Sequence, residues 1–277
     1  MKTIMMMLAA CLFTAAAVSC GGKKVEKAPK ILVLYYSQTS NTKAVAEEIK
    51  NRLGADIEEV TAKVPYDGTF QETIERSAKE REEGAYPEID SIKSDIASYD
   101  VIFLGYPIWF GTYAPPITTL LNRIDLNGKK VVPFCTFGSG GLESSVADLK
   151  AKFPEAEVLE GYGVRAARMD AAPNELDRFL KEKGFVEGEV EKLEAFSAPS
   201  EVSEEEAAIF DEAVKDYPMI SAKAKEVSKR DLPNGVEYLF YAVNVPKAGG
   251  PQPPAKEMKV YVLVEKDKAP VFTQVVR

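Results

Sequence analysis

The chain has 277 residues, 45% of them hydrophobic and 28% charged, which is the balance of a folded protein long enough for two domains. Its formal net charge of −8 argues against nucleic-acid binding, which requires clustered Lys and Arg side chains. The absence of His excludes Ser-His-Asp and Cys-His catalysis and removes the commonest side-chain ligand of transition metals, so we expect no metal site.

Residues 1–22 have the pattern of an export signal. Lys2 supplies a positive start, and residues 4–18 form an uncharged, mostly apolar run that is short for a membrane span of about 20 residues. Small residues precede Cys20, a pattern that resembles the lipobox of bacterial lipoproteins, in which the Cys carries the lipid. We therefore expect an anchor at Cys20 and a location in the bacterial cell envelope, outside the cytoplasm. A plain secretory signal and an uncleaved anchor are the alternatives.

The sequence contains three cysteines, of which Cys11 and Cys20 fall in the signal. No internal disulfide framework is therefore predicted. Cys135 stands inside an apolar run and is interpreted as a small core side chain rather than a reactive thiol.

From Lys30 the chain alternates short apolar runs with helical patterns, as is typical of a parallel sheet with helices on both faces. The predicted strands are residues 31–36, 57–61, 101–105, 131–137 and 158–164. The predicted helices are residues 42–53, 70–83, 115–124, 142–153 and 173–183. We therefore predict a doubly wound, five-stranded α/β domain over residues 30–185.

The pattern changes after this domain. A Ser/Pro-containing stretch at residues 197–200 reads as a linker, and residues 204–216 form one amphipathic helix. Alternating strand patterns follow at residues 220–230, 236–245, 259–265 and 271–276. One helix followed by an antiparallel sheet predicts a smaller α+β module over residues 196–277.

Three loops that leave predicted strands carry the candidate chemistry, because open α/β sheets bind ligands at the carboxyl ends of their strands. The first loop opens a helix, whose free N–H groups and hydroxyl-bearing neighbours suit a phosphate, although such residues also serve as ordinary helix caps. The second contains the only Trp, and the third is rich in Gly, which lets backbone approach a flat ligand. Together they predict a site for a flat, phosphorylated cofactor.

Residues 30–185 resemble flavodoxins, particularly those with a YPxWxG-type second loop. The resemblance implies strand order 2-1-3-4-5 and bound FMN. The first loop would hold the phosphate through Ser37, Gln38, Thr39, Ser40, Asn41 and Thr42. The second would contribute Pro107, Trp109, Gly111 and Tyr113, with Trp109 or Tyr113 stacking on the ring. The third would contribute Thr136, Phe137, Gly138, Ser139 and Gly140. Ser40 departs from the pattern, since flavodoxins often carry Gly at that position.

The resemblance leads to three functional hypotheses. The first is one-electron transfer by FMN, with no catalytic residue of the chain's own and a redox partner protein that the sequence does not identify. The second is an FMN-dependent reductase of quinones or nitro compounds, fed by a nicotinamide cofactor. The third is a surface binding module with a vestigial flavin site. Flavin content separates the first from the third, and nicotinamide-dependent turnover separates the first from the second.

The C-terminal module resembles a bacterial cystatin-like domain. Cystatins that inhibit cysteine proteases carry a QxVxG loop after their helix, and residues 225–229, with the sequence KEVSK, stand in that region here. Since neither the Gln nor the Gly is present, protease inhibition is not predicted. We expect the module to fold separately and to be dispensable for flavin binding.

Overall fold

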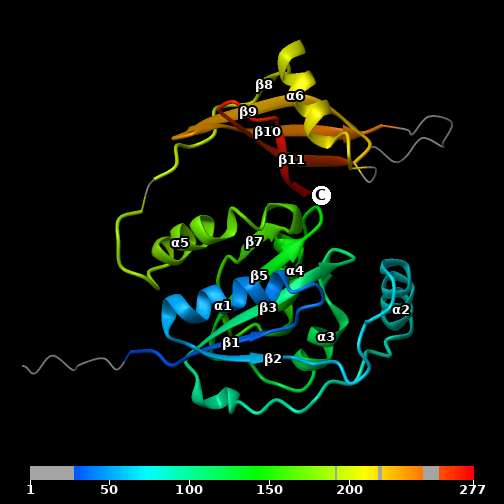
Figure 1. Ribbon diagram of the computed structural model, residues 1–277, viewed down its shortest axis with the longest axis vertical. Helices are drawn as coiled ribbons and strands as arrows, with labels where there is room; N and C mark the ends of the chain where they lie inside the picture. The colour runs from blue at the N-terminus through cyan, green and yellow to red at the C-terminus, as the bar shows by residue number, and fades with distance from the viewer. Residues whose placement is uncertain (1–27, 191, 218–219, 246–255) are drawn as a thin grey trace, which may run out of the picture.

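The structure of the protein is a computed structural model that describes residues 28–190, 192–217, 220–245 and 256–277. Within these ranges the chain forms two sheets, each with its own helices (Figure 1). The predicted signal and Cys20 lie outside the described residues. In the part of the chain that is described, no helix is both long enough and apolar enough to cross a membrane.

The first sheet has the strand order β2-β1-β3-β5-β6, with β7 also beside β5 and the short β4 beside β3. All its pairings are parallel except that of β4 with β3. The strands are β1 (Ile31–Tyr35), β2 (Asp56–Glu59), β3 (Val101–Trp109), β4 (Thr112–Tyr113), β5 (Lys130–Phe137), β6 (Glu157–Val158) and β7 (Tyr162–Arg165). The predicted doubly wound sheet of order 2-1-3-4-5 is thus confirmed, with β6 and β7 together forming its fifth strand.

The two parts of this fifth strand are separated by a segment that contains Gly161. β6 pairs with the start of β5, and β7 pairs with its end. Between them, a Cβ on Gly161 would lie 2.7 Å from the carbonyl oxygen of Pro133. The chain therefore passes β5 more closely than any residue with a side chain would allow.

Helices cover both faces of this sheet. The helices of this domain are α1 (Asn41–Leu53), α2 (Phe70–Glu83), η1 (Ile96–Ser98), α3 (Pro115–Leu121), α4 (Leu142–Lys152), η2 (Ala166–Arg168) and α5 (Ala172–Glu182), of which α1, α3, α4 and α5 pack on the sheet. On one face, α1 and α5 bury Ile49 and Leu180 in a cluster with Phe103. On the other, α3 and α4 bury Leu120 and Leu149. Both faces thus exclude water, which explains the continuous apolar runs in the strands.

Helix α2 has the predicted bounds, and its ends show why the sequence predicts them. Thr69 and Glu72 form a reciprocal capping box at the start, and Gly84 ends the helix with φ of 64°. Only Ser77 of this helix is buried, and Figure 1 shows α2 beside the domain rather than on a sheet face.

The second sheet is antiparallel and has the order β12-β11-β10-β9-β8. Its elements are β8 (Ser200–Glu201), α6 (Glu204–Val214), β9 (Ala222–Leu232), β10 (Gly235–Asn244), β11 (Glu257–Glu265) and β12 (Val271–Val276). Helix α6 packs on this sheet, with the rings of Phe210 and Phe240 centred 5.2 Å apart. The predicted α+β module is confirmed.

Two details of the C-terminal domain differ from the prediction. The stretch taken as a linker belongs to the sheet edge, because the Ser197 amide donates to the Lys229 carbonyl over 2.8 Å and Ser200 pairs with Val227. Residues 225–229, placed by resemblance in a loop, lie inside β9, and the turn that follows is at Pro233 and Asn234. The alternating pattern at residues 220–230 had predicted this strand, so the loop assignment that came from the cystatin resemblance is the one that was wrong.

Candidate functional site

The first loop joins β1 to α1 and has a strained backbone at one residue. Ser40 has φ of 64°, a conformation that favours Gly and that the resemblance anticipated. Helix α1 begins at Asn41, so its first amides have no acceptor within the helix, and that of Lys43 donates to Ser37 Oγ over 3.2 Å. Thr39 and Ser40 are exposed at this positive helix end. The loop therefore offers neutral N–H and O–H donors to an anion.

Thr42 lies deeper than the rest of this loop. Its hydroxyl is 2.8 Å from the hydroxyl of Thr136 at the end of β5, and both residues are at most 5% exposed. This contact joins the first loop to the third. Both hydroxyls already have a partner, so the structure gives them a supporting position, whereas Thr39 faces solvent.

The second loop is a β-hairpin, which the sequence prediction missed. Strand β3 continues beyond its predicted end to Trp109 and pairs with β4, so that Trp109 faces Thr112 across a two-residue turn. The turn residues Phe110 and Gly111 have φ of 54° and 82°. Positive φ at both central residues is the requirement of a type I′ turn, and Phe is an unusual residue there. Phe110 is 57% exposed at the tip.

A side chain from α2 holds this hairpin. The guanidinium of Arg81 donates to the carbonyl of Tyr113 over 2.6 Å and to that of Trp109 over 3.3 Å. It also lies 5.9 Å from the ring centre of Phe110. Sequence reasoning did not identify Arg81, because α2 and the second loop are distant in the chain and no local pattern shows that they are in contact.

Trp109 belongs to an aromatic cluster that sequence reasoning also missed. Its ring meets those of Tyr66 and Tyr36 edge to face, at centroid distances of 5.1 and 6.1 Å. Burial is the main cause that raises the pKa of Tyr66 and of Tyr36, so both phenols stay protonated at neutral pH. Tyr36 directly precedes the first loop, and that position is the one signal that could have identified it.

The two predicted stacking residues have different environments. Tyr113 is only 9% exposed and packs edge to face against Tyr106 in the core. Trp109 is half-buried at the site. Of the pair, Trp109 is therefore the ring that a ligand reaches without unpacking the core.

The third loop follows β5 and lies against the hairpin. Phe137 is buried, whereas Gly138 is exposed and Ser139 and Gly140 are half-buried. A Cβ on Gly141 would lie 2.5 Å from the Ile108 side chain, so the third loop approaches the hairpin too closely for a larger residue.

All three loops therefore meet at one edge of the sheet. The first is joined to the third by the two threonine hydroxyls and to the second by the aromatic cluster. The Ser144 hydroxyl donates to the Gly111 carbonyl and joins the third to the second. Among the described residues no group of side chains could hold a metal ion. As expected, Cys135 is buried in the core, and this burial raises the pKa of its thiol.

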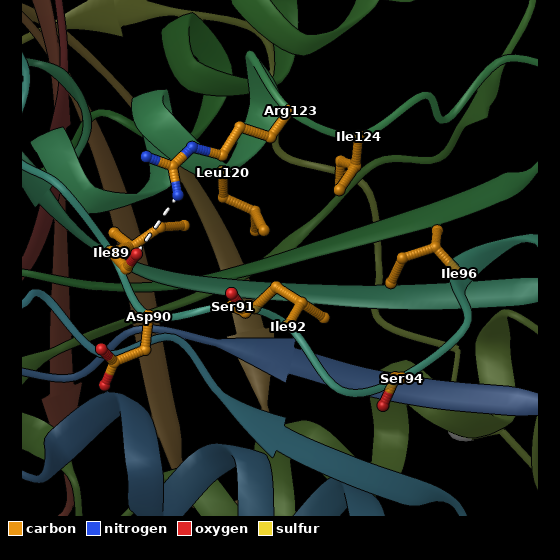
Figure 2. A pocket seen from close by; sticks show the side chains of 9 residues that line it. All are labelled: Ile89, Asp90, Ser91, Ile92, Ser94, Ile96, Leu120, Arg123 and Ile124. Atoms are coloured by element: carbon orange, nitrogen blue, oxygen red, sulfur yellow. Dashed lines mark hydrogen bonds between the residues drawn. The ribbon is translucent and has the colours of Figure 1, made fainter.

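A shallow hollow of about 320 Å³ lies elsewhere, between α3 and the segment before β3 (Figure 2). Figure 2 shows the Arg123 side chain reaching the carbonyl of Ile89, a hydrogen bond of 3.2 Å. Its lining mixes aliphatic side chains such as Leu120 and Ile124 with polar ones such as Asp90 and Arg123. None of the residues that line it belongs to the three loops, and we do not assign it to the site.

The fold and this loop arrangement define a flavodoxin-like protein, with a doubly wound parallel sheet and three converging loops at the carboxyl ends of its strands. The family described as Flavodoxin matches residues 30–178, more than half of the 277-residue chain. The chain therefore belongs to the flavodoxin family.

Several solved structures are similar to the N-terminal domain. A candidate flavoprotein from Bacteroides eggerthii is 34% identical, with 54% of this chain and 96% of that chain covered and a TM-score of 0.47. A flavoprotein from Lactobacillus acidophilus in complex with FMN is 27% identical, with 55% and 98% covered and a TM-score of 0.46. Oxidised flavodoxin 2 from Bacillus cereus is 23% identical, with 54% and 94% covered and a TM-score of 0.37. No curated protein sequence matches the chain.

Proposed function

We propose that the N-terminal domain binds FMN and transfers electrons to and from a partner protein. The observation that carries this proposal is the convergence of the three loops, joined by the Thr42–Thr136 contact and by the Tyr36–Trp109 ring pair. Family membership and the FMN in the similar Lactobacillus acidophilus protein support it. When bound, FMN supplies the redox chemistry, and the protein's part is to hold it and tune its surroundings.

The residues present fit this cofactor. A phosphate at the first loop meets the amino-terminal end of α1, where N–H groups have no acceptor within the helix, and the exposed hydroxyl of Thr39, so it needs no basic side chain. A flat ring fits against the half-buried face of Trp109, whose edge contacts with Tyr66 and Tyr36 fix its orientation. Gly138 leaves open space on the third loop for close backbone approach.

The carrier role is supported by the exposed tip of the second loop. Phe110 is 57% exposed and directly follows Trp109, so a ring stacked there lies near the surface. The Phe110–Gly111 turn beside that ring is strained at Phe110, and Gly111 would tolerate the backbone change if this peptide turned over in response to the redox state of the ring. An acidic protein and an aromatic wall disfavour added negative charge on the ring, so we expect a low reduction potential.

We further propose that the domain works at a membrane surface, tethered through a lipid on Cys20. The short apolar run and the small residues before Cys20 support this. Residues 23–29 are then a charged tether between the lipid and β1.

The decisive experiment compares FMN with riboflavin, which has the same ring and no phosphate. Titration of each flavin into the full chain, followed by quenching of flavin fluorescence, should show FMN bound more tightly. Thr39→Ala should weaken the binding of FMN and leave the binding of riboflavin unchanged. Thr61→Ala, the same change at an exposed threonine outside the loops, is the control and should alter neither affinity. A folded protein that binds no FMN would refute the proposal. Rapid oxidation of NADH or NADPH by the FMN-loaded protein would instead favour a reductase.

A further inference from the structure

The C-terminal strand lies on the third loop. In Figure 1 the end of the chain, in red, comes down beside the connection between β5 and α4. The amide of Val275 donates to the carbonyl of Ser139 over 2.7 Å. A Cβ on Gly140 would overlap the carbonyl oxygen of Val275, so only Gly fits beneath β12. The edge strand of the second sheet therefore bonds to the loop assigned to the cofactor's ring.

A buried arginine strengthens this contact. Arg165, at the end of β7, is 4% exposed, and its Nε donates to the carbonyl of Gly138 over 3.0 Å. Its Nη1 donates across the interface to the carbonyl of Phe272. The guanidinium lies 4.4 Å from the ring centre of Tyr217 and 4.8 Å from that of Phe272. One cation thus bonds a carbonyl of the third loop and a carbonyl of β12.

The charge on Arg165 has an energetic cost that the contact offsets. Burial, with a smaller contribution from Arg168, lowers the pKa of Arg165 to about 10, so it is still a cation at neutral pH. Burying a cation is unfavourable unless hydrogen bonds and aromatic faces compensate. Here Phe272 and Tyr217, which supply part of that compensation, both belong to the C-terminal domain. The third loop and β12 are therefore stabilised together.

We propose that the C-terminal domain is part of the flavin site, because β12 docks on the third loop and holds it in the conformation that receives the ring. This inference rests on the proposed function and replaces the expectation that the domain is dispensable for flavin binding. A loop that is already ordered loses less entropy when it binds a ligand, so docking raises affinity. Linkage then requires FMN to strengthen the docking of β12 by the same factor.

The hydrogen bond can be removed while the backbone pairing of β12 with β11 is kept, and because the Val275 side chain is 3% exposed in the core of the second domain, the control variant must shorten that side chain as well. In an antiparallel strand the N–H and C=O of one residue point to the same side, and those of Val275 face residues 139 and 140. Val275 is paired with Val260, yet its N–H points away from β11. Proline is tolerated at such an outward-facing edge position. Val275→Pro therefore deletes the interdomain donor, and Val275→Ala is the matched control that keeps it.

The test measures FMN affinity in the full chain by fluorescence. Val275→Pro should raise the dissociation constant of FMN about three- to tenfold, the effect of one lost hydrogen bond, and Val275→Ala should change it little. Tyr217→Leu removes the ring that the C-terminal domain places beside Arg165, and it should also raise the dissociation constant of FMN. It is the second interface variant and replaces Val275→Pro if that variant does not fold. Unchanged affinity in either folded interface variant would overturn the inference.

Hydrogen exchange separates this inference from the proposed function. Without flavin, the peptide covering residues 136–145 should exchange faster in Val275→Pro than in the wild type. With FMN, residues 270–277 of the wild type should become more protected, as linkage requires. Equal exchange in the first comparison, or no added protection in the second, contradicts the docking role even if FMN binds. Wild-type protein that binds no FMN refutes the proposed function itself.

Discussion

The hydroxyl oxygens of Thr42 and Thr136 lie 2.8 Å apart, although 94 residues separate them in the chain. Thr42 stands in the first turn of α1 and Thr136 near the end of β5, and both are buried. Because β3 lies between β1 and β5 in the sheet, this contact spans β3 and sets the distance between the first and third loops. The contact joins two loops, and no local sequence pattern indicates that they meet.

The threonine pair should be coupled in stability. Thr42→Val keeps the shape but leaves the Thr136 hydroxyl buried without its partner, so we expect a loss of about 1–3 kcal/mol in the free energy of unfolding. Adding Thr136→Val should cost little more, because the unpaired group is then removed. Urea denaturation of the four chains measures this cycle. Simple additivity of the two single losses would mean that the hydroxyls do not interact.

The backbone strain at Phe110 should be relieved by a residue that accepts positive φ. Phe110 has φ of 54°, and Asn adopts this region far more readily than an aromatic residue. We expect Phe110→Asn to stabilise the domain by about 1 kcal/mol, seen as a rise of a few degrees in Tm. Phe70→Asn, at an 81% exposed phenylalanine that starts α2, is the control and should give no such gain. Equal effects of the two changes would show that lost apolar exposure, rather than strain, is responsible.

Trp109 should dominate ring binding and flavin quenching. Trp109→Ala removes a large, half-buried aromatic ring from the site. The affinities for FMN and for riboflavin should therefore fall by similar factors. The loss should exceed the 0.5–1.5 kcal/mol typical of an aromatic pair, since buried apolar area is lost as well, and about tenfold or more is expected. Phe70→Ala controls for removal of an exposed ring. Retained quenching by Trp109→Ala would place the ring elsewhere.

The C-terminal domain should lose stability in acid through Glu206. This carboxylate accepts the Lys229 ammonium over 2.8 Å and the Ser203 amide over 2.9 Å, which lowers its pKa from 4.5 to about 2. A lowered folded-state pKa contributes stability that is complete above the unfolded value and is lost as the pH falls toward about 2. We therefore expect the free energy of unfolding to fall across that window.

Glu206→Gln tests this assignment. It should reduce the acid dependence and cost about 0.5–2 kcal/mol near neutral pH, as losses of helix caps do. Glu205→Gln removes an equal charge from the same turn and should retain the full acid dependence. Urea unfolding at several pH values, followed by the amide signals of β9 and β10, provides the measurement. Parallel pH profiles for wild type and Glu206→Gln would contradict the assignment.

The lipid anchor is tested by changing single cysteines. Lipid chains contribute about 0.8 kcal/mol per buried CH₂, so their loss should release the protein from membranes. Cys20→Ser, expressed in a bacterium, should move to the soluble fraction, and Cys11→Ser, in the same apolar run, should stay with the membrane. Membrane partition of Cys20→Ser equal to that of the wild type would rule out Cys20 as the anchor.

Local sequence was sufficient wherever an element depends on its own residues. Apolar runs predicted the parallel strands, and the family resemblance predicted their order. Helix α2 was predicted with its observed bounds, and the structure shows that these bounds coincide with local helix signals at Thr69, Glu72 and Gly84. The positions of the three loops were also predicted from the strand ends, although the second loop is a hairpin that extends β3 to Trp109. Ser40 was recognised as a departure from the usual Gly, and its φ of 64° explains why Gly is favoured there.

Tertiary structure alone decided which of these residues are accessible at the three loops and which are buried against the rest of the protein. Thr42 and Tyr113 are buried by partners far away in the chain, Thr136 and Tyr106, so their side chains are already in contact within the protein. The hold of Arg81 on the second loop and the contact of Val275 with Ser139 also join distant segments. A pattern of period 2 or 3.6 determines how a segment buries its own face, whereas the choice of partner depends on how the whole chain packs.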